Sequence, residues 1–220
     1  MQADGSGAQQ LTTTGDFNSI QIAPSPDGRY LSFLAGDKLC RLEIDGARIQ
    51  TLTRNPQIGS STFSPDGKWL FYSVIQGADQ GVWKISADGG EPVRFPGIRS
   101  GFIFSTDGRH LATGEIDEHG NQFAQIWPAE GGPMLKRLPL RASKGGLSVD
   151  WLGADSLIYS LIGGSAPGFY HLSLKDGAEK PLVILRDGNL AGGSISANGQ
   201  NAVYIAGAEV SNLVILQNYR

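Results

Sequence analysis

Short apolar runs alternate with polar turn residues along most of the chain. In one stretch, apolar, aromatic and β-branched residues gather at positions 61–63, 69–74, 81–85 and 92–95, with Gly, Pro, Asp and Ser between them. Such runs, bounded by turn residues, are typical of β-strands joined by hairpins. Apolar residues do not recur with a helical period over any long segment, so we expect essentially no helix.

Two turn motifs recur along the chain. The first reads Ser-Pro-Asp-Gly or a variant of it and lies at positions 25–28, 64–67, 105–108 and 196–199, with a degenerate copy at 152–155. The second is Asp-Gly or Glu-Gly at positions 4–5, 45–46, 88–89, 130–131 and 176–177. In both motifs Gly accepts the positive φ of a tight turn, and Asp or Asn tolerates it. Two interleaved series with a common period of roughly 40–45 residues indicate a repeat protein.

Each repeat is predicted to be a four-stranded antiparallel blade with strands a to d from channel to rim. The first turn motif then joins strands a and b, and the second joins c and d. The fold class is therefore all-β: a β-propeller of about five blades, or a fragment of a larger propeller with six or seven. We assign residues 1–220 to a single propeller domain, with repeats at about 19–53, 59–95, 99–138, 148–185 and 193–216. Alternation along strand c places Arg41, Lys84 and His171 on a common polar face.

The two ends of the chain leave two architectures open. Residues 7–13 are predicted to form an outer strand d, whereas the last repeat stops after its strand c. In the first interpretation, the N-terminal strand completes the last blade and closes a five-bladed ring, which removes exposed sheet edges. In the second, the chain is the C-terminal part of a larger propeller that began before residue 1.

Composition narrows the classes of function. The 220 residues carry a net charge of −3, so we expect no nucleic-acid partner. No run approaches the ~18 consecutive apolar residues of a membrane helix, so we expect no direct insertion into a membrane. The first ten residues lack the basic start and apolar stretch of a secretory leader. The single cysteine, Cys40, cannot form an internal disulfide.

The turns and hairpins resemble a known repeat. Segments 25–31 (SPDGRYL) and 64–70 (SPDGKWL), with hairpin segments 3–12 and 87–92, are similar to the WD-repeat-like propeller repeat of the TolB family. The resemblance covers almost the whole chain and is weakest in the fourth repeat. It implies a bacterial protein-binding, sensor or scaffold propeller in a periplasmic or otherwise extracytoplasmic location, with a cytoplasmic location as the alternative. Members of that family carry six blades and a separate N-terminal domain, and neither is recognisable here.

Patterns that would support catalysis or metal binding are weak. Segments 146–150 and 192–196 approach a Gly-x-Ser-x-Gly nucleophile elbow but lack its closing Gly. His110, His119 and His171 lie in different repeats without metal-ligand spacing, so we expect no metal site. The aspartates at 27, 66 and 107 each precede a Gly, which favours turn residues over calcium ligands. The tryptophans at 69, 83, 127 and 151 could stack on a sugar, although core packing is the simpler interpretation for the first two.

A recurrent arginine is the best candidate for binding chemistry. We expect the d–a connections to share one end of the blades with the b–c loops, which contribute Asp117 and His119. This end could bind a small anionic ligand or an acidic loop of a protein partner. Alternatively, its charges are solvated and partly paired with acids of the b–c loops. The arginines at the d–a connections of four successive repeats are Arg54, Arg99, Arg141 and Arg186.

The sequence therefore favours a non-catalytic propeller that acts as a protein-interaction, sensor or scaffold domain within a larger bacterial protein, without a cofactor. Two alternatives stay open. One is the substrate-gating propeller of a prolyl-oligopeptidase-like hydrolase, and the other is a lectin-like ligand-binding propeller. The fold alone does not choose between them, because propellers carry many activities.

Overall fold

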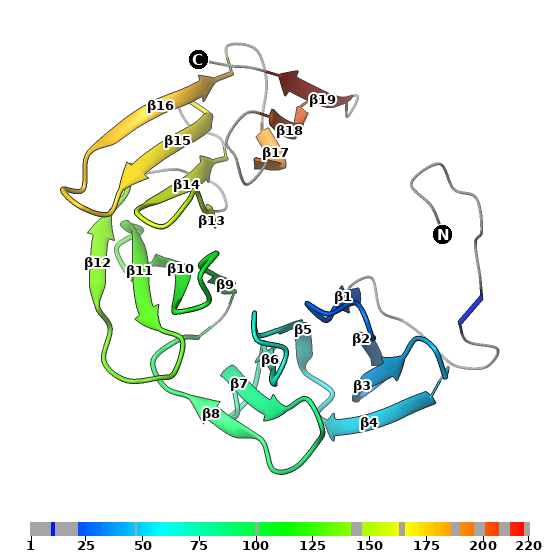
Figure 1. The fold of residues 1–220 in the computed structure, drawn as a ribbon. Coiled ribbons are helices and arrows are strands. Elements are labelled where there is room, and N and C mark those ends of the chain that lie inside the picture. The colour runs from blue at the N-terminus through cyan, green and yellow to red at the C-terminus, as the bar shows by residue number, and fades with distance from the viewer. Residues whose placement is uncertain are drawn as a thin grey trace. The chain divides into compact units, whose positions relative to one another are not determined.

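The structure is a computed structural model (Figure 1). It describes residues 10–11, 22–46, 48–99, 101–141, 147–162, 166–185, 190–195, 201–206 and 212–217, the last three segments by their backbone alone. The chain divides into two compact units, Met1–Ser100 and Gly101–Arg220. None of the described segments forms a helix that is long and apolar enough to cross a membrane.

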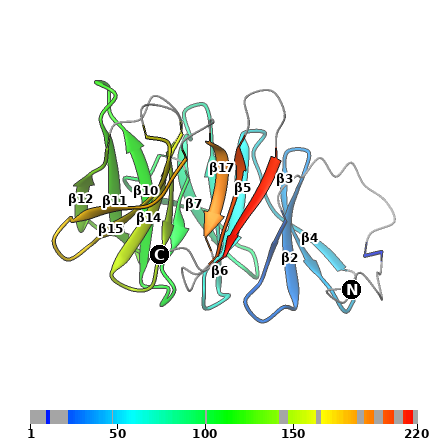
Figure 2. The same cartoon turned by 90° about the horizontal axis from the view of Figure 1, so that it is seen from above.

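The first unit contains two four-stranded antiparallel sheets, here called the first and second blades. In each blade the strands lie in chain order, so every neighbour in the sheet is also the neighbour in sequence. Figures 1 and 2 both show β2, β3 and β4 side by side. The first blade comprises β1 (Ile22–Pro24), β2 (Tyr30–Ala35), β3 (Lys38–Glu43) and β4 (Arg48–Arg54); the second comprises β5 (Ile58–Phe63), β6 (Trp69–Val74), β7 (Gly81–Ser86) and β8 (Val93–Phe95).

The second unit contains the third and fourth blades, again with four strands each, and a fifth sheet in which three strands are described. The third blade comprises β9 (Ile103–Phe104), β10 (His110–Ile116), β11 (Gln122–Pro128) and β12 (Lys136–Pro139). The fourth comprises β13 (Leu147–Trp151), β14 (Ser156–Leu161), β15 (Gly168–Ser173) and β16 (Glu179–Ile184). The fifth sheet comprises β17 (Leu190–Ile195), β18 (Asn201–Ala206) and β19 (Asn212–Gln217).

The predicted fold class is confirmed. The chain is all-β, and four sheets have the four antiparallel strands of a propeller blade. The Ser-Pro-Asp-Gly turns join the first and second strands of a blade, and the Asp-Gly turns join the third and fourth, as the sequence predicted. Of the proposed outer strand at 7–13, only residues 10–11 are described, without strand structure, so ring closure and the single-domain assignment stay predictions.

Apolar clusters join neighbouring blades within each unit. Leu39 on β3 is fully buried and belongs to one cluster with Phe63, Leu70 and Ile85 of the second blade. In the second unit an equivalent cluster joins the third and fourth blades around Trp151. Because a blade is covered by a neighbour, both faces of its middle strands become buried, and Cys40 is inaccessible next to Leu39. Burial of this kind contributes roughly 25 cal/mol per Å² of apolar surface.

Candidate functional site

The Ser-x-Asp-Gly turns share one set of hydrogen bonds. Ser25 Oγ donates to Asp27 Oδ1 over 2.6 Å and accepts the backbone N–H of Tyr30 over 2.9 Å. Asp27 Oδ1 also accepts the backbone N–H of Arg29. The hydroxyl donated by Ser25 is the main reason that the pKa of Asp27 lies below its ordinary value. The glycine that ends the turn, Gly28, takes a φ of 71°, as the sequence predicted.

The same turn is built at two further places. Ser64 and Ser105 donate to Asp66 and Asp107 over 2.6 Å each, and both aspartates accept a backbone N–H two residues further on. These bonds lower the pKa of both carboxyl groups. The carboxylates therefore stabilise the turns, in agreement with the turn interpretation. Among the described residues, no group of three or more His, Cys, Asp or Glu side chains is arranged to hold a metal ion.

The second residue after each of the first two turns is aromatic and lies against a cation from the third strand of its blade. The guanidinium carbon of Arg41 lies 4.4 Å from the ring centre of Tyr30, and Lys84 Nζ lies 4.9 Å from that of Trp69. The pairing follows from register: Arg41 pairs with Ser32 and Lys84 with Phe71, so each cation is diagonal to the aromatic residue. Cation–π contacts of this kind are worth about 0.5–1 kcal/mol at exposed sites.

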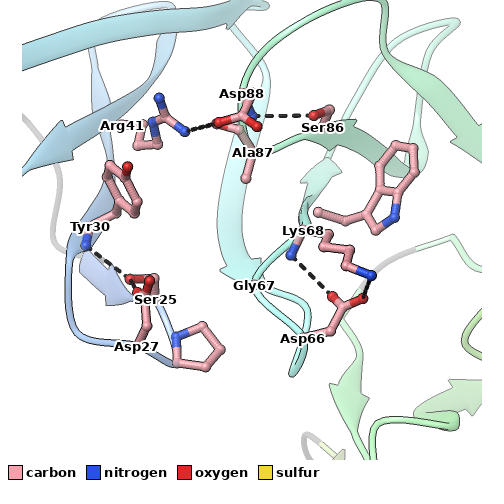
Figure 3. Close-up of a pocket in the computed structure, with 12 residues that line it drawn as sticks. Ser25, Asp27, Tyr30, Arg41, Asp66, Gly67, Lys68, Ser86, Ala87 and Asp88 are labelled. Atoms are coloured by element: carbon pink, nitrogen blue, oxygen red, sulfur yellow. Dashed lines mark hydrogen bonds and ion pairs between the residues drawn. The ribbon is translucent and has the colours of Figure 1, made fainter.

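Arg41 also bonds the first blade to the second (Figure 3). Its Nη1 donates to the backbone carbonyl of Ala87 and, over 2.9 Å, to Asp88 Oδ1, both in the turn between β7 and β8. Its Nη2 donates to Gln50 Oε1, and Gln50 Nε2 in turn donates to the Asp88 carbonyl. The Arg41 side chain is 14% exposed, so its donors are largely used within the protein.

A groove of about 490 Å³ lies between these turns in the first unit. The two Ser-Pro-Asp-Gly turns approach closely along it, because a Cβ built on Gly67 would lie 3.7 Å from Pro26 Cδ. Figure 3 shows Asp27 and Asp66 at these turns and Arg41 and Asp88 at the opposite side. The groove is lined by Ser25, Pro26, Asp27, Tyr30, Arg41, Asp66, Gly67, Lys68, Trp69, Ser86, Ala87 and Asp88.

The sequence did not predict this groove, which lies at the turn end of the blades. The predicted arginines follow the outer strands, at the other end of the blade. The sequence nevertheless contained a signal. Tyr30 and Trp69 occupy the same position after the first turn of their repeats, and Arg41 and Lys84 share one face of the third strand. Local patterning placed Arg41 and Lys84 on one face of the strand, whereas the groove depends on how the second blade packs on the first.

The structure places the predicted arginines in separate surroundings. Arg54, at the end of β4, lies 3.4 Å from Asp37 in the turn between β2 and β3, and both side chains are about half exposed. Arg99 follows β8 with an exposed side chain. Arg186 lies outside the described residues. The Arg54–Asp37 pair matches the alternative in which these charges are solvated and partly paired.

In the second unit, the half-exposed side chain of Arg141 lies against the fourth blade. Its Nε lies 3.3 Å from Glu179 Oε2, and its guanidinium lies 5.4 Å from the Tyr170 ring centre. The Tyr159 hydroxyl donates to Glu179 Oε1 over 2.6 Å. Burial and the Glu179 carboxylate raise the pKa of Tyr159, so this cluster joins the third and fourth blades through a neutral phenol and an ion pair.

Asp117 and His119 come together in the turn between β10 and β11. Asp117 accepts the backbone N–H groups of His119 and Asn121 over 2.9 and 2.8 Å, and the Asn121 side-chain amide over 2.9 Å. These bonds, led by that of Asn121, lower the pKa of Asp117. The His119 ring is 75% exposed and lies 3.6 Å from Glu118. In the described part of the chain, no hydrogen bond or ion pair links this turn to the predicted arginines.

Comparisons with known proteins support the repeat family. No family model matches the chain. It is 28% identical over 94 residues to the Tol-Pal system protein TolB of Haemophilus ducreyi, a stretch that covers 43% of this chain and only 21% of that protein. A putative TolB from Agrobacterium tumefaciens superimposes with a TM-score of 0.69 at 15% identity, covering 94% of this chain and 79% of the other. An oligogalacturonate lyase in complex with manganese gives 0.72 at 12% identity, covering 95% and 67%.

The low identities to solved structures show the fold alone, whereas the sequence match to TolB adds the repeat type. Because the match covers about a fifth of the curated relative, the activity of that whole protein does not transfer with it. The chain is built of TolB-like β-propeller repeats.

Proposed function

We propose that this propeller is a non-catalytic interaction module that binds a segment of a partner protein in the groove between its first two blades. The single observation that carries the proposal is the groove itself. Its volume of about 490 Å³ falls in the range of ligand clefts, and its wall combines Tyr30 and Trp69 with charged turn residues. Aromatic residues and arginine are the side chains most enriched at the centres of protein interfaces.

The hydrogen bonds in the groove support a binding role over a catalytic one. A nucleophilic serine needs a neighbouring base that accepts its proton and is itself free to relay it. Ser25 and Ser64 instead bond to the aspartate of their own turn and to a backbone N–H. The same Ser–Asp bond recurs in the third blade, which argues that its purpose is to shape the turn.

The matched relative is named as a Tol-Pal system protein, and TolB homologues are periplasmic, which supports a location outside the cytoplasm. We propose an extracytoplasmic location on this basis. Alkaline phosphatase fused to the native gene product, which is active only outside the reducing cytoplasm, would report it. An inactive fusion that is present at normal levels would place the protein in the cytoplasm.

Site-directed photo-crosslinking in the native host tests the binding role. The crosslinker p-benzoylphenylalanine replaces Lys68, whose side chain is 78% exposed beside the groove. The matched control replaces Leu135, which is 51% exposed in the third blade and does not line the groove. We expect a discrete adduct of defined mass from position 68 and none from position 135. Absence of an adduct at 68, or equal adducts at both positions, would contradict the proposal.

A further inference from the structure

Resting on the proposed function, we infer that the groove selects a basic, extended segment of its partner, whose Arg or Lys side chain enters between Asp27 and Asp66 while its backbone accepts a hydrogen bond from Trp69. Three features of the groove carry this inference: the unbalanced charge of its wall, the engagement of its cations, and the free indole donor.

Negative charge dominates the side chains that line the groove. Three of them are carboxylates and two are cations. The bonds within the turns lower the pKa of Asp27 and Asp66, so both stay ionised well into the acidic range. In the described part of the chain, Asp27 uses only Oδ1 in hydrogen bonds, which leaves Oδ2 for a ligand. A cationic side chain complements this wall.

The two cations of the groove are already engaged. Arg41 donates to Asp88, Gln50 and the Ala87 carbonyl and stacks on Tyr30. Lys68 lies 4.0 Å from Asp66 Oδ2. An anionic ligand would therefore have to compete with the carboxylates for these cations, whereas a cationic one meets Asp27 Oδ2, which makes no hydrogen bond among the described residues. This favours a basic segment over an acidic one.

Trp69 supplies a hydrogen-bond donor for the backbone of the segment. The structure describes all four tryptophans, and three of their indole N–H groups donate within the protein, from Trp83, Trp127 and Trp151. The indole N–H of Trp69 has no acceptor among the described residues, although the side chain lines the groove and is only partly exposed. Partly buried donors of this kind normally find a partner, so a peptide carbonyl is a suitable one.

The two carboxylates lie on turns that adjoin one another. Pro26 of one turn lies within contact distance of a Cβ on Gly67 of the other. A basic side chain that enters between these turns would lie next to Asp27 and Asp66, while Trp69, three residues after Asp66, lines the same groove. An extended peptide offers this combination, because its side chains and its carbonyls alternate along the strand.

Titration of the ¹⁵N-labelled chain with two short peptides tests the inference. The probes are acetyl-GRSRG-amide and its acidic counterpart acetyl-GESEG-amide. The four indole N–H signals are resolved from backbone signals, and loss of one signal in Trp69→Phe assigns that of Trp69. We expect the basic peptide to shift the Trp69 signal saturably and the acidic peptide to leave it unchanged. Movement by the acidic peptide alone, or by neither, would overturn the inference.

Substitution of the turn aspartates separates recognition from turn structure. Asparagine keeps an oxygen that accepts the bonds of the turn, so Asp27→Asn and Asp66→Asn remove mainly charge. Asp107→Asn is the matched control, because Asp107 makes the same turn bonds in the third blade outside the groove. We expect each groove variant to weaken the basic peptide about two- to fivefold, and the pair about tenfold, with no change in the control. Equal weakening in all three would overturn the inference.

The two proposals fail separately. If the crosslink at position 68 forms but the basic peptide does not bind, the groove is an interaction site for a partner of different chemistry, and only the basic-segment inference is wrong. If the peptide shifts Trp69 but no crosslink forms in the cell, the groove binds basic chains in solution without serving as the partner site.

Discussion

Arg41 on β3 and Asp88 in the turn after β7 form an ion pair of 2.9 Å that joins the first blade to the second. The two residues are 47 positions apart in sequence, slightly more than one repeat, and the bond exists only because the blades stack. The Ala87 carbonyl accepts from the same Nη1, so Arg41 holds both backbone and side chain of the neighbouring turn. These bonds fasten one wall of the groove to both blades.

Replacing Arg41 by methionine is expected to destabilise the first unit by about 2 kcal/mol, because the Ala87 carbonyl and Gln50 lose a charged donor in a mostly buried place. Asp88→Asn is the control. Its carboxylate is 92% exposed, and exposed ion pairs contribute about 1 kcal/mol or less. Urea unfolding followed by tryptophan fluorescence measures both. A loss in Asp88→Asn as large as in Arg41→Met would show that the ion pair, and not the bond to the backbone, joins the blades.

We expect the turn aspartates to make the stability of the fold depend on pH in the acidic range. Their folded-state pKa values lie below the ordinary value of 3.8, so the native chain binds fewer protons than the unfolded chain around that pH. The contribution is complete above about pH 5 and is lost as the pH falls through the lowered pKa values. Urea midpoints at a series of pH values should therefore drop in acid. A triple variant, Asp27→Asn with Asp66→Asn and Asp107→Asn, should show a shallower drop, and an unchanged slope would contradict the assignment.

The parts of the fold that sequence could predict are local. A Ser-Pro-Asp-Gly turn is specified by four adjacent residues, since Ser25 and Asp27 bond to one another and to the backbone between β1 and β2. Such bonds need no partner from elsewhere in the chain, so each motif by itself predicts a turn. Strands follow from the turns that bound them, and the order of each sheet follows from hairpins.

The candidate site could not be predicted in the same way, because it depends on contacts between repeats. Arg54 is one of a regular series in the sequence, yet its pairing with Asp37 depends on the geometry of its own blade. Arg41 belongs to the less regular series of polar residues on the third strand of each blade, yet its side chain pairs with Asp88 of the next blade. The sequence contains both series. Only the packing of the first blade on the second shows that Arg41 borders a groove.

A side chain at Gly168 is expected to be far more costly than one at an open glycine. A Cβ on Gly168 would lie 2.0 Å from the backbone carbonyl oxygen of Val183 on the neighbouring strand, where the register shifts between Phe169 and Tyr170. Because backbone must move, Gly168→Ala should cost at least about 2 kcal/mol. Gly46→Ala is the control, since its nearest neighbour would be the flexible end of Glu43 at 3.8 Å, and it should change stability by less than about 0.5 kcal/mol. Thermal unfolding compares the two; similar melting temperatures would argue against the close approach at Gly168.

We expect the predicted arginines to differ in how much they contribute to the stability of the fold. Arg141 is 54% exposed, but it pairs with Glu179, which is only 18% exposed and also accepts from Tyr159, and it lies against the Tyr170 ring, so Arg141→Gln should cost about 1 kcal/mol. Arg54 pairs at 3.4 Å with Asp37 in a setting where both side chains are about half exposed, and Arg54→Gln should cost less than about 0.5 kcal/mol. Urea unfolding in low and high salt measures both. Salt should remove the small effect at Arg54 and reduce that at Arg141 less, because the partner of Arg141, Glu179, is mostly buried whereas Asp37 is about half exposed. A large, salt-resistant loss at Arg54 would contradict its interpretation as a solvated surface charge.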